Sequence, residues 1–90
     1  MTANPMILIV DDEPANIEIM AAALQEDYEI CFACNGADAI RLAQQTMPTL
    51  ILLDVVMPVR DGYDVCREIK SNPALRDIPV IFTTSRDAAE

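Results

Sequence analysis

The stretch Leu50-Ile51-Leu52-Leu53-Asp54 decides the fold of this chain. A continuous run of four aliphatic residues is typical of a strand buried on both faces, as in a parallel sheet. The run ends in an acid, and the loop Val55–Arg60 follows it. The same pattern opens the chain, where the aliphatic run Met6–Val10 ends in Asp11 and Asp12. We therefore expect two buried parallel strands, each with acids at its carboxyl end.

Helical patterns separate these strands from two others. Pro14 suits the first turn of a helix, and an apolar stripe at helical spacing follows it. Asn35 and Asp61 are each placed to cap a helix, and Pro48 marks the end of the second one. The stripe of that second helix is Ala39, Ile40, Ala43 and Met47. The remaining predicted strands are Tyr28–Ala33 and Ile78–Thr83. Alternation of strands and helices predicts an α/β fold, a parallel sheet with helices on both faces.

The composition excludes several classes of function. The chain has 90 residues, six Lys and Arg against fifteen Asp and Glu, a net charge of −9 and no His. One small domain is expected at this length. The acid excess argues against direct nucleic-acid binding, and the apolar runs are too short for a membrane span. No signal peptide is visible, so we expect a cytoplasmic protein with three reduced cysteines. Histidine zinc sites and histidine-dependent triads are excluded.

Acids stand where a parallel α/β sheet places its functional crevice, beyond the carboxyl ends of the strands. Asp11, Asp12 and Asp54 would converge there, and Thr84 follows the fourth strand. Clustered carboxylates repel one another unless a cation lies among them, and hard oxygen ligands favour Mg²⁺. A carboxylate beside Mg²⁺ can attack phosphorus, and the Thr84 hydroxyl could then bond the phosphoryl group. The alternative is that these acids are only solvated caps and turn formers.

Three motifs give the chain a family resemblance. They are Asp11-Asp12, Leu-Leu-Asp54-x-x-Met57-Pro58-x-x-Asp61-Gly62 and Pro79-Val80-Ile81-x-x-Thr84-Ser85. Over Met6–Arg86 the sequence resembles the CheY-like receiver domain of bacterial two-component response regulators. The resemblance implies a flavodoxin-like fold and a signalling module that is not itself an enzyme. It also implies that a sensor histidine kinase or a phosphotransfer protein phosphorylates Asp54.

The resemblance assigns further roles residue by residue. Thr84 would be the switch hydroxyl, and Ser85 the small residue that leaves room for the phosphoryl group. Mg²⁺ would be held by Asp11, Asp12, Asp54 and the backbone carbonyl of Val56.

The sequence also departs from the family pattern. Receivers have five strand–helix units in the strand order 2-1-3-4-5, and the motifs here stop after strand four. The strand-five Lys has no counterpart, so we expect residues 1–90 to form a single, incomplete receiver domain. Its fourth strand would be an open apolar edge, and we expect self-association through it.

Two other functions are alternatives to the phosphoacceptor module. One is an interaction module that is not phosphorylated. The other is a Mg²⁺-dependent phosphohydrolase, which is disfavoured because the acid it needs two residues after the nucleophile is replaced by Val56.

Overall fold

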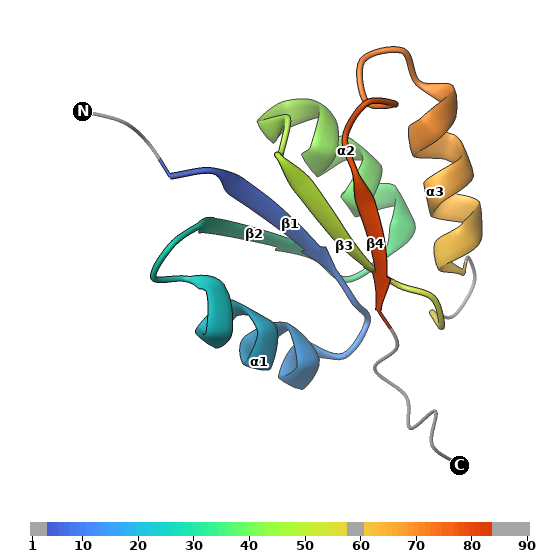
Figure 1. The fold of residues 1–90 in the computed structure, drawn as a ribbon. Coiled ribbons are helices and arrows are strands. Elements are labelled where there is room, and N and C mark those ends of the chain that lie inside the picture. The colour runs from blue at the N-terminus through green and yellow to red at the C-terminus, as the bar shows by residue number, and fades with distance from the viewer. Residues whose placement is uncertain (1–3, 58–60, 84–90) are drawn as a thin grey trace.

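The computed structural model describes residues 4–57 and 61–83, in which strands and helices alternate (Figure 1). All strand pairs are parallel, and the order across the sheet is β2-β1-β3-β4. This confirms the predicted flavodoxin-like, CheY-like fold. No helix in these ranges is long and apolar enough to cross a bilayer. The elements are β1 (Met6–Val10), α1 (Pro14–Leu24), β2 (Glu29–Ala33), α2 (Gly36–Thr46), β3 (Leu50–Asp54), α3 (Gly62–Ser71) and β4 (Val80–Thr83).

The sheet divides the core into two parts, because successive side chains of a strand point to opposite faces. On one face Ile7 and Ile9 of β1 pack against Ile17 of α1. On the other face Leu8 and Val10 join the larger cluster under α2 and α3. Helix α1 covers β1 and β2, and Figure 1 shows α2 and α3 on the opposite side of the sheet.

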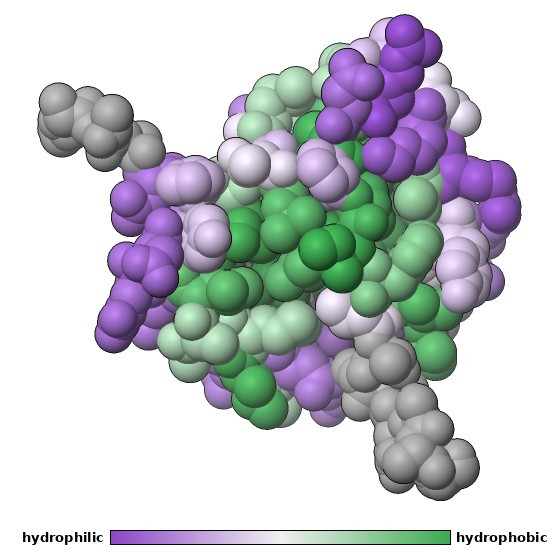
Figure 2. Space-filling model, viewed as in Figure 1, coloured by the Kyte–Doolittle hydropathy of each residue, from purple (hydrophilic) through white to green (hydrophobic). Residues whose placement is uncertain are grey.

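The α1 side of β3 and β4 is not covered by a helix in the described ranges. Leu50 and Leu52 are only half-buried there, and Ile81 of β4 is 51% exposed. We call these three residues the uncovered apolar face. Figure 2 shows hydrophobic side chains gathered over the strands in the centre of this view. Exposed apolar surface of this kind is unusual for a solvent-facing sheet.

The helix starts agree with the sequence. The side chain of Asn35 accepts a hydrogen bond from the Asp38 N–H at 2.8 Å, and that of Asp61 accepts from the Asp64 N–H at 2.9 Å. The end of α2 differs from expectation. Met47 was expected in the apolar stripe, but it is the C-cap, has a left-handed backbone with φ 48°, and is 51% exposed. The left-handed turn carries its side chain away from the core.

Strands β2 and β4 both begin after the residue at which the sequence predicted their start. Tyr28 still belongs to the turn that ends α1, because its N–H donates to the Leu24 carbonyl at 3.0 Å. Ile78 likewise lies in a turn and donates to the Leu75 carbonyl at 3.0 Å. Lys70 stabilises that turn, because its Nζ donates a hydrogen bond to the Ile78 carbonyl at 2.7 Å. Strand β4 therefore starts at Val80.

Candidate functional site

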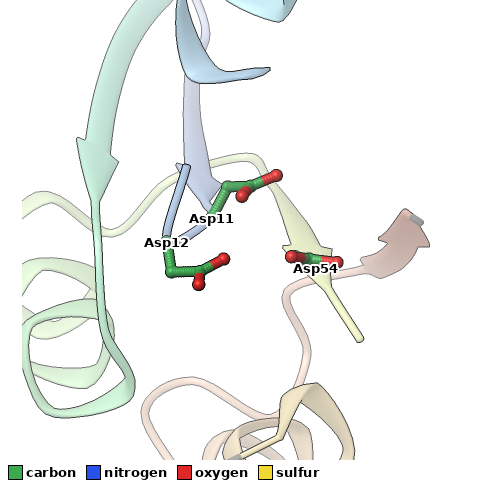
Figure 3. Close-up of side chains that lie close together, drawn as sticks. All are labelled: Asp11, Asp12 and Asp54. Atoms are coloured by element: carbon green, nitrogen blue, oxygen red, sulfur yellow. The ribbon is translucent and has the colours of Figure 1, made fainter. Parts of the chain in front are cut away.

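Three carboxylates meet at the carboxyl edge of the sheet (Figure 3). Asp54 is the last residue of β3, and Asp11 and Asp12 directly follow β1. Because β1 and β3 are neighbours in register, Val10 opposite Leu53, their ends bring the acids together. One oxygen from each of the three carboxylates lies within 4.8 Å of the other two.

Two of the three carboxylates are buried, and Asp11 has an unsatisfied oxygen among the described residues. Asp11 and Asp54 are both fully buried. Oδ1 of Asp11 accepts from the Glu13 N–H at 2.9 Å, and Oδ1 of Asp54 accepts from the Val56 N–H at 3.2 Å. Within the described part of the chain, the buried Oδ2 of Asp11 has no hydrogen-bond partner. A buried polar atom without a partner is costly, and a bound cation would satisfy it.

The pKa of Asp11 also favours a bound cation in the cluster. Burial raises the pKa of Asp11, and the charges of Asp54 and Asp12 raise it further. The hydrogen bond from the Glu13 backbone N–H opposes that rise. A divalent cation would relieve both the desolvation and the repulsion. Three carboxylate oxygens, with water in the remaining positions, fit the octahedral oxygen shell of Mg²⁺.

The loop after β3 is held close to Asp54 by Gly62. The Gly62 N–H donates to the Val55 carbonyl at 2.9 Å. A β carbon on Gly62 would lie 2.3 Å from the Asp54 backbone oxygen. The sequence indicated turn and cap chemistry at Asp61-Gly62, and the cap is present. It did not reveal that α3 begins in contact with the Asp54 backbone, although a glycine at a helix start is a signal for such close approach.

The roles predicted for the Val56 carbonyl, Thr84 and Ser85 stay predictions. The backbone N–H of Val56 reaches Asp54, and its side chain is 45% exposed. Thr84 and Ser85 lie outside the described residues. Thr83, for which the sequence predicted no role, is paired with Asp54 across β3 and β4. Only the strand register, which the sequence does not give directly, brings that residue to the site.

The three cysteines differ in their burial. Cys66 packs against the larger core cluster. The Cys31 thiol lies 3.8 Å from the Ile7 carbonyl, and burial raises its pKa. Cys34 is exposed, because it follows the end of β2.

Comparisons with known proteins agree with this geometry. The sequence family described as the response regulator receiver domain matches residues 7–90 of this chain. The response regulator PleD of Caulobacter vibrioides is 45% identical over 82 residues, which are 90% of this chain. The chain spans only 18% of the length of PleD.

Solved structures of receiver domains superpose closely. The N-terminal domain of a response regulator receiver protein from Methanoculleus marisnigri JR1 has a TM-score of 0.87 and 35% identity. The superposition covers 91% of this chain and 68% of the Methanoculleus chain. The receiver domain of the sensor histidine kinase PA1611 from Pseudomonas aeruginosa, solved with a magnesium ion in its active site cleft, has a TM-score of 0.85 and 34% identity. That superposition covers 93% of this chain and 70% of the PA1611 chain. The chain therefore belongs to the response regulator receiver domain family of two-component signalling.

Proposed function

We propose that Asp54 accepts a phosphoryl group from a phosphohistidine on a sensor histidine kinase or a phosphotransfer protein. One observation carries this proposal: the Asp54 side chain is buried beside the oxygens of Asp11 and Asp12. Acids that serve only as solvated caps would be exposed, as Asp61 is at the start of α3. Family membership supports the same role.

The reaction is a phosphoryl transfer between two protein side chains. An oxygen of the Asp54 carboxylate attacks phosphorus, and an O–P bond forms as the P–N bond of the donor breaks. The imidazole leaves with the electron pair and later takes up a proton from water. The hydrogen bond from the Val56 N–H to Oδ1 of Asp54 keeps the carboxylate oriented for this attack.

Mg²⁺ is the proposed cofactor. Asp11, Asp12 and Asp54 would hold it, with the backbone carbonyl of Val56 as a further ligand. When bound, the metal neutralises negative charge on the transferring phosphoryl oxygens. The donor set of hard oxygens and the buried Oδ2 of Asp11 support this assignment. The magnesium-bound PA1611 receiver domain supports it by similarity.

Mass spectrometry tests the proposal. The protein is incubated with Mg²⁺ and acetyl phosphate, and the expected result is the mass gain of one phosphoryl group. Asp54→Asn should abolish this gain, whereas Asp27→Asn should not, because Asp27 is exposed at the end of α1. Omission of Mg²⁺ should also abolish it. Equal labelling of the wild-type protein and Asp54→Asn would refute the assignment of Asp54.

The open edge of β4 favours a second interaction. In the described ranges β4 has β3 on one side and no strand on the other. Ile81 is 51% exposed on one face, and Phe82, in ring contact with Tyr63, is 40% exposed on the opposite face. We propose that two copies associate through this edge, which would satisfy backbone groups and bury both side chains. Sedimentation at increasing protein concentration measures this association.

A further inference from the structure

We propose that the groove between α1 and β2 binds an extended segment of a partner protein, in which an apolar side chain stands next to a basic one. The groove is separate from the carboxylate cluster, because none of Asp11, Asp12 and Asp54 lines it. Binding there does not require a phosphoryl group on Asp54, so the inference goes beyond the proposed function.

The groove is apolar and has a volume of about 430 Å³. Ile17 and Ala21 line it from α1, and Ile30 and Phe32 line it from β2. The side chain of Ala21 is short, which leaves space between the helix and the strand. Phe32 is 58% exposed in this groove. A partner that covered the aromatic ring would therefore gain free energy by removing apolar surface from water.

Strand β2 offers backbone hydrogen bonds beside the groove. It is an outer strand, with β1 as its only neighbour in the described sheet (Figure 1). The Glu29 N–H points to the β1 side and donates to the Pro5 carbonyl at 2.8 Å. Because successive residues of a strand direct their backbone groups to opposite sides, those of Ile30 and Phe32 point to the open edge. The two residues whose side chains line the groove thus also present their backbone to a partner.

The charge of this region selects a basic partner. Glu18 of α1 lines the groove and is exposed. All six Lys and Arg residues of the chain come after residue 40, so neither α1 nor β2 carries a basic side chain. A partner's Lys or Arg would be attracted by Glu18 and repelled by no cation of these two elements. Complementary charge of this kind speeds association and excludes acidic partners.

An extended segment meets all three requirements. Added beside β2, it would pair with the outward backbone groups of Ile30 and Phe32. Its alternate side chains point to one face, so an apolar residue in the groove has its second neighbour along the chain on the same face. A basic residue at that position would lie on the face that carries Glu18. In recognition by strand addition, backbone hydrogen bonds supply affinity and pockets for alternate side chains supply specificity.

The experiment measures binding of a short fluorescent peptide in which Leu and Lys alternate. Anisotropy titrations compare the wild-type protein with Glu18→Lys and Phe32→Ser, and we expect each variant to weaken binding by about tenfold. The matched controls are Asp77→Lys, an exposed acid after α3, and Tyr63→Ser, an exposed aromatic on α3. Both controls should bind like wild type. Equal losses in Glu18→Lys and Asp77→Lys would mean attraction to net charge alone and would overturn the proposal.

Hydrogen exchange tests the strand pairing directly. The bound peptide should slow exchange of the Ile30 and Phe32 amide protons, whereas the Glu29 amide, already bonded to Pro5, should change little. The same peptide N-methylated at alternate residues cannot donate to the edge, and it should bind more weakly. Equal binding of the methylated peptide, or unchanged exchange at Ile30 and Phe32, would overturn strand addition.

Two more samples identify the occupant. Asp54→Asn should bind the peptide as tightly as wild type, because the groove does not include the phosphoacceptor. A peptide of alternating Leu and Glu should not bind, and equal binding of it would contradict the basic partner. If the protein alone self-associated and Phe32→Ser abolished that association in sedimentation, the occupant would be a second copy and the partner segment would be excluded.

Discussion

Gly62 lies so close to Asp54 that a β carbon on it would be 2.3 Å from the Asp54 backbone oxygen and 3.0 Å from the carbonyl carbon. Both atoms are backbone, so no side chain can rotate away to make room. The first residue of α3 is thereby packed against the residue that we propose to be phosphorylated. A change in the backbone at either position must be accommodated by the other.

Gly62→Ala should therefore disturb both stability and phosphorylation. We expect a loss of about 2 kcal/mol in the free energy of unfolding, as for overpacked cores, together with slower labelling by acetyl phosphate. Urea titration and mass spectrometry measure the two effects. Ser71→Ala, at the exposed end of the same helix, should change the free energy by less than about 0.5 kcal/mol. A Gly62→Ala protein as stable as wild type would show that the contact is not tight.

Asp11 should make the metal-free protein less stable as pH rises. Burial raises its pKa in the folded state above the usual 3.8. Its contribution is therefore fully present below pH 3.8 and is lost as pH increases through the raised value. Asp11→Asn removes this loss, and we expect a gain of about 1 kcal/mol at neutral pH. Urea midpoints measured from pH 4 to pH 8 give the comparison.

Added Mg²⁺ should reverse the order of these two proteins. The cation stabilises the wild-type folded state by binding to it, whereas Asp11→Asn lacks one of its ligands. Asp27→Asn is the matched control, because that exposed acid should alter neither the pH dependence nor the response to Mg²⁺. If Mg²⁺ stabilised Asp11→Asn as much as wild type, Asp11 would not be a ligand.

The cap of α2 should contribute independently of the site. Asn35 accepts a hydrogen bond from the Asp38 N–H at 2.8 Å, and its own amide donates to the Asp38 carboxylate at 3.1 Å. Asn35→Ala should cost about 1 kcal/mol of unfolding free energy. Asn35→Ser, which keeps a capping oxygen, should recover most of that cost. Equal losses in both variants would mean that the cap oxygen is not what stabilises the helix start.

Ile81 gives a direct test of self-association. Ile81→Glu places a charge on the uncovered apolar face and should shift the protein towards the monomer at micromolar concentrations. Phe32→Glu is the control, because Phe32 is 58% exposed on the opposite edge strand, β2. Sedimentation velocity distinguishes the variants. A wild-type protein that stays monomeric over the whole range would exclude the dimer.

Much of this fold could be predicted from the sequence because its strands are aliphatic runs that end in acids. Leu50–Asp54 has the predicted limits, and the caps at Asn35 and Asp61 are local patterns with local causes. The start of β4 was harder to predict, since it depends on Lys70 donating a hydrogen bond to a carbonyl eight residues away. The exposed position of Met47 depends on a left-handed backbone that methionine rarely adopts.

The candidate site divides in the same way. The acids could be predicted because parallel strands carry their ends to one edge of the sheet. The place of Thr83 opposite Asp54 required the register, and the contact of Gly62 required the path of the loop. Both are consequences of tertiary packing, which short sequence patterns do not encode.

The sheet separates two cores, and this has a consequence for local opening. Among the described residues, the cluster beneath α1 contains three buried side chains, whereas the one beneath α2 and α3 contains twelve. Amide protons of α1 should therefore exchange with solvent sooner than those of β1 and β3, as expected for a less stable cooperative unit. Asp11 and Asp12 precede α1, and Asp54 precedes α3. A cation bound among these three acids would link the two units. The amide protons of α1 would then exchange at the same rate as those of β1 and β3.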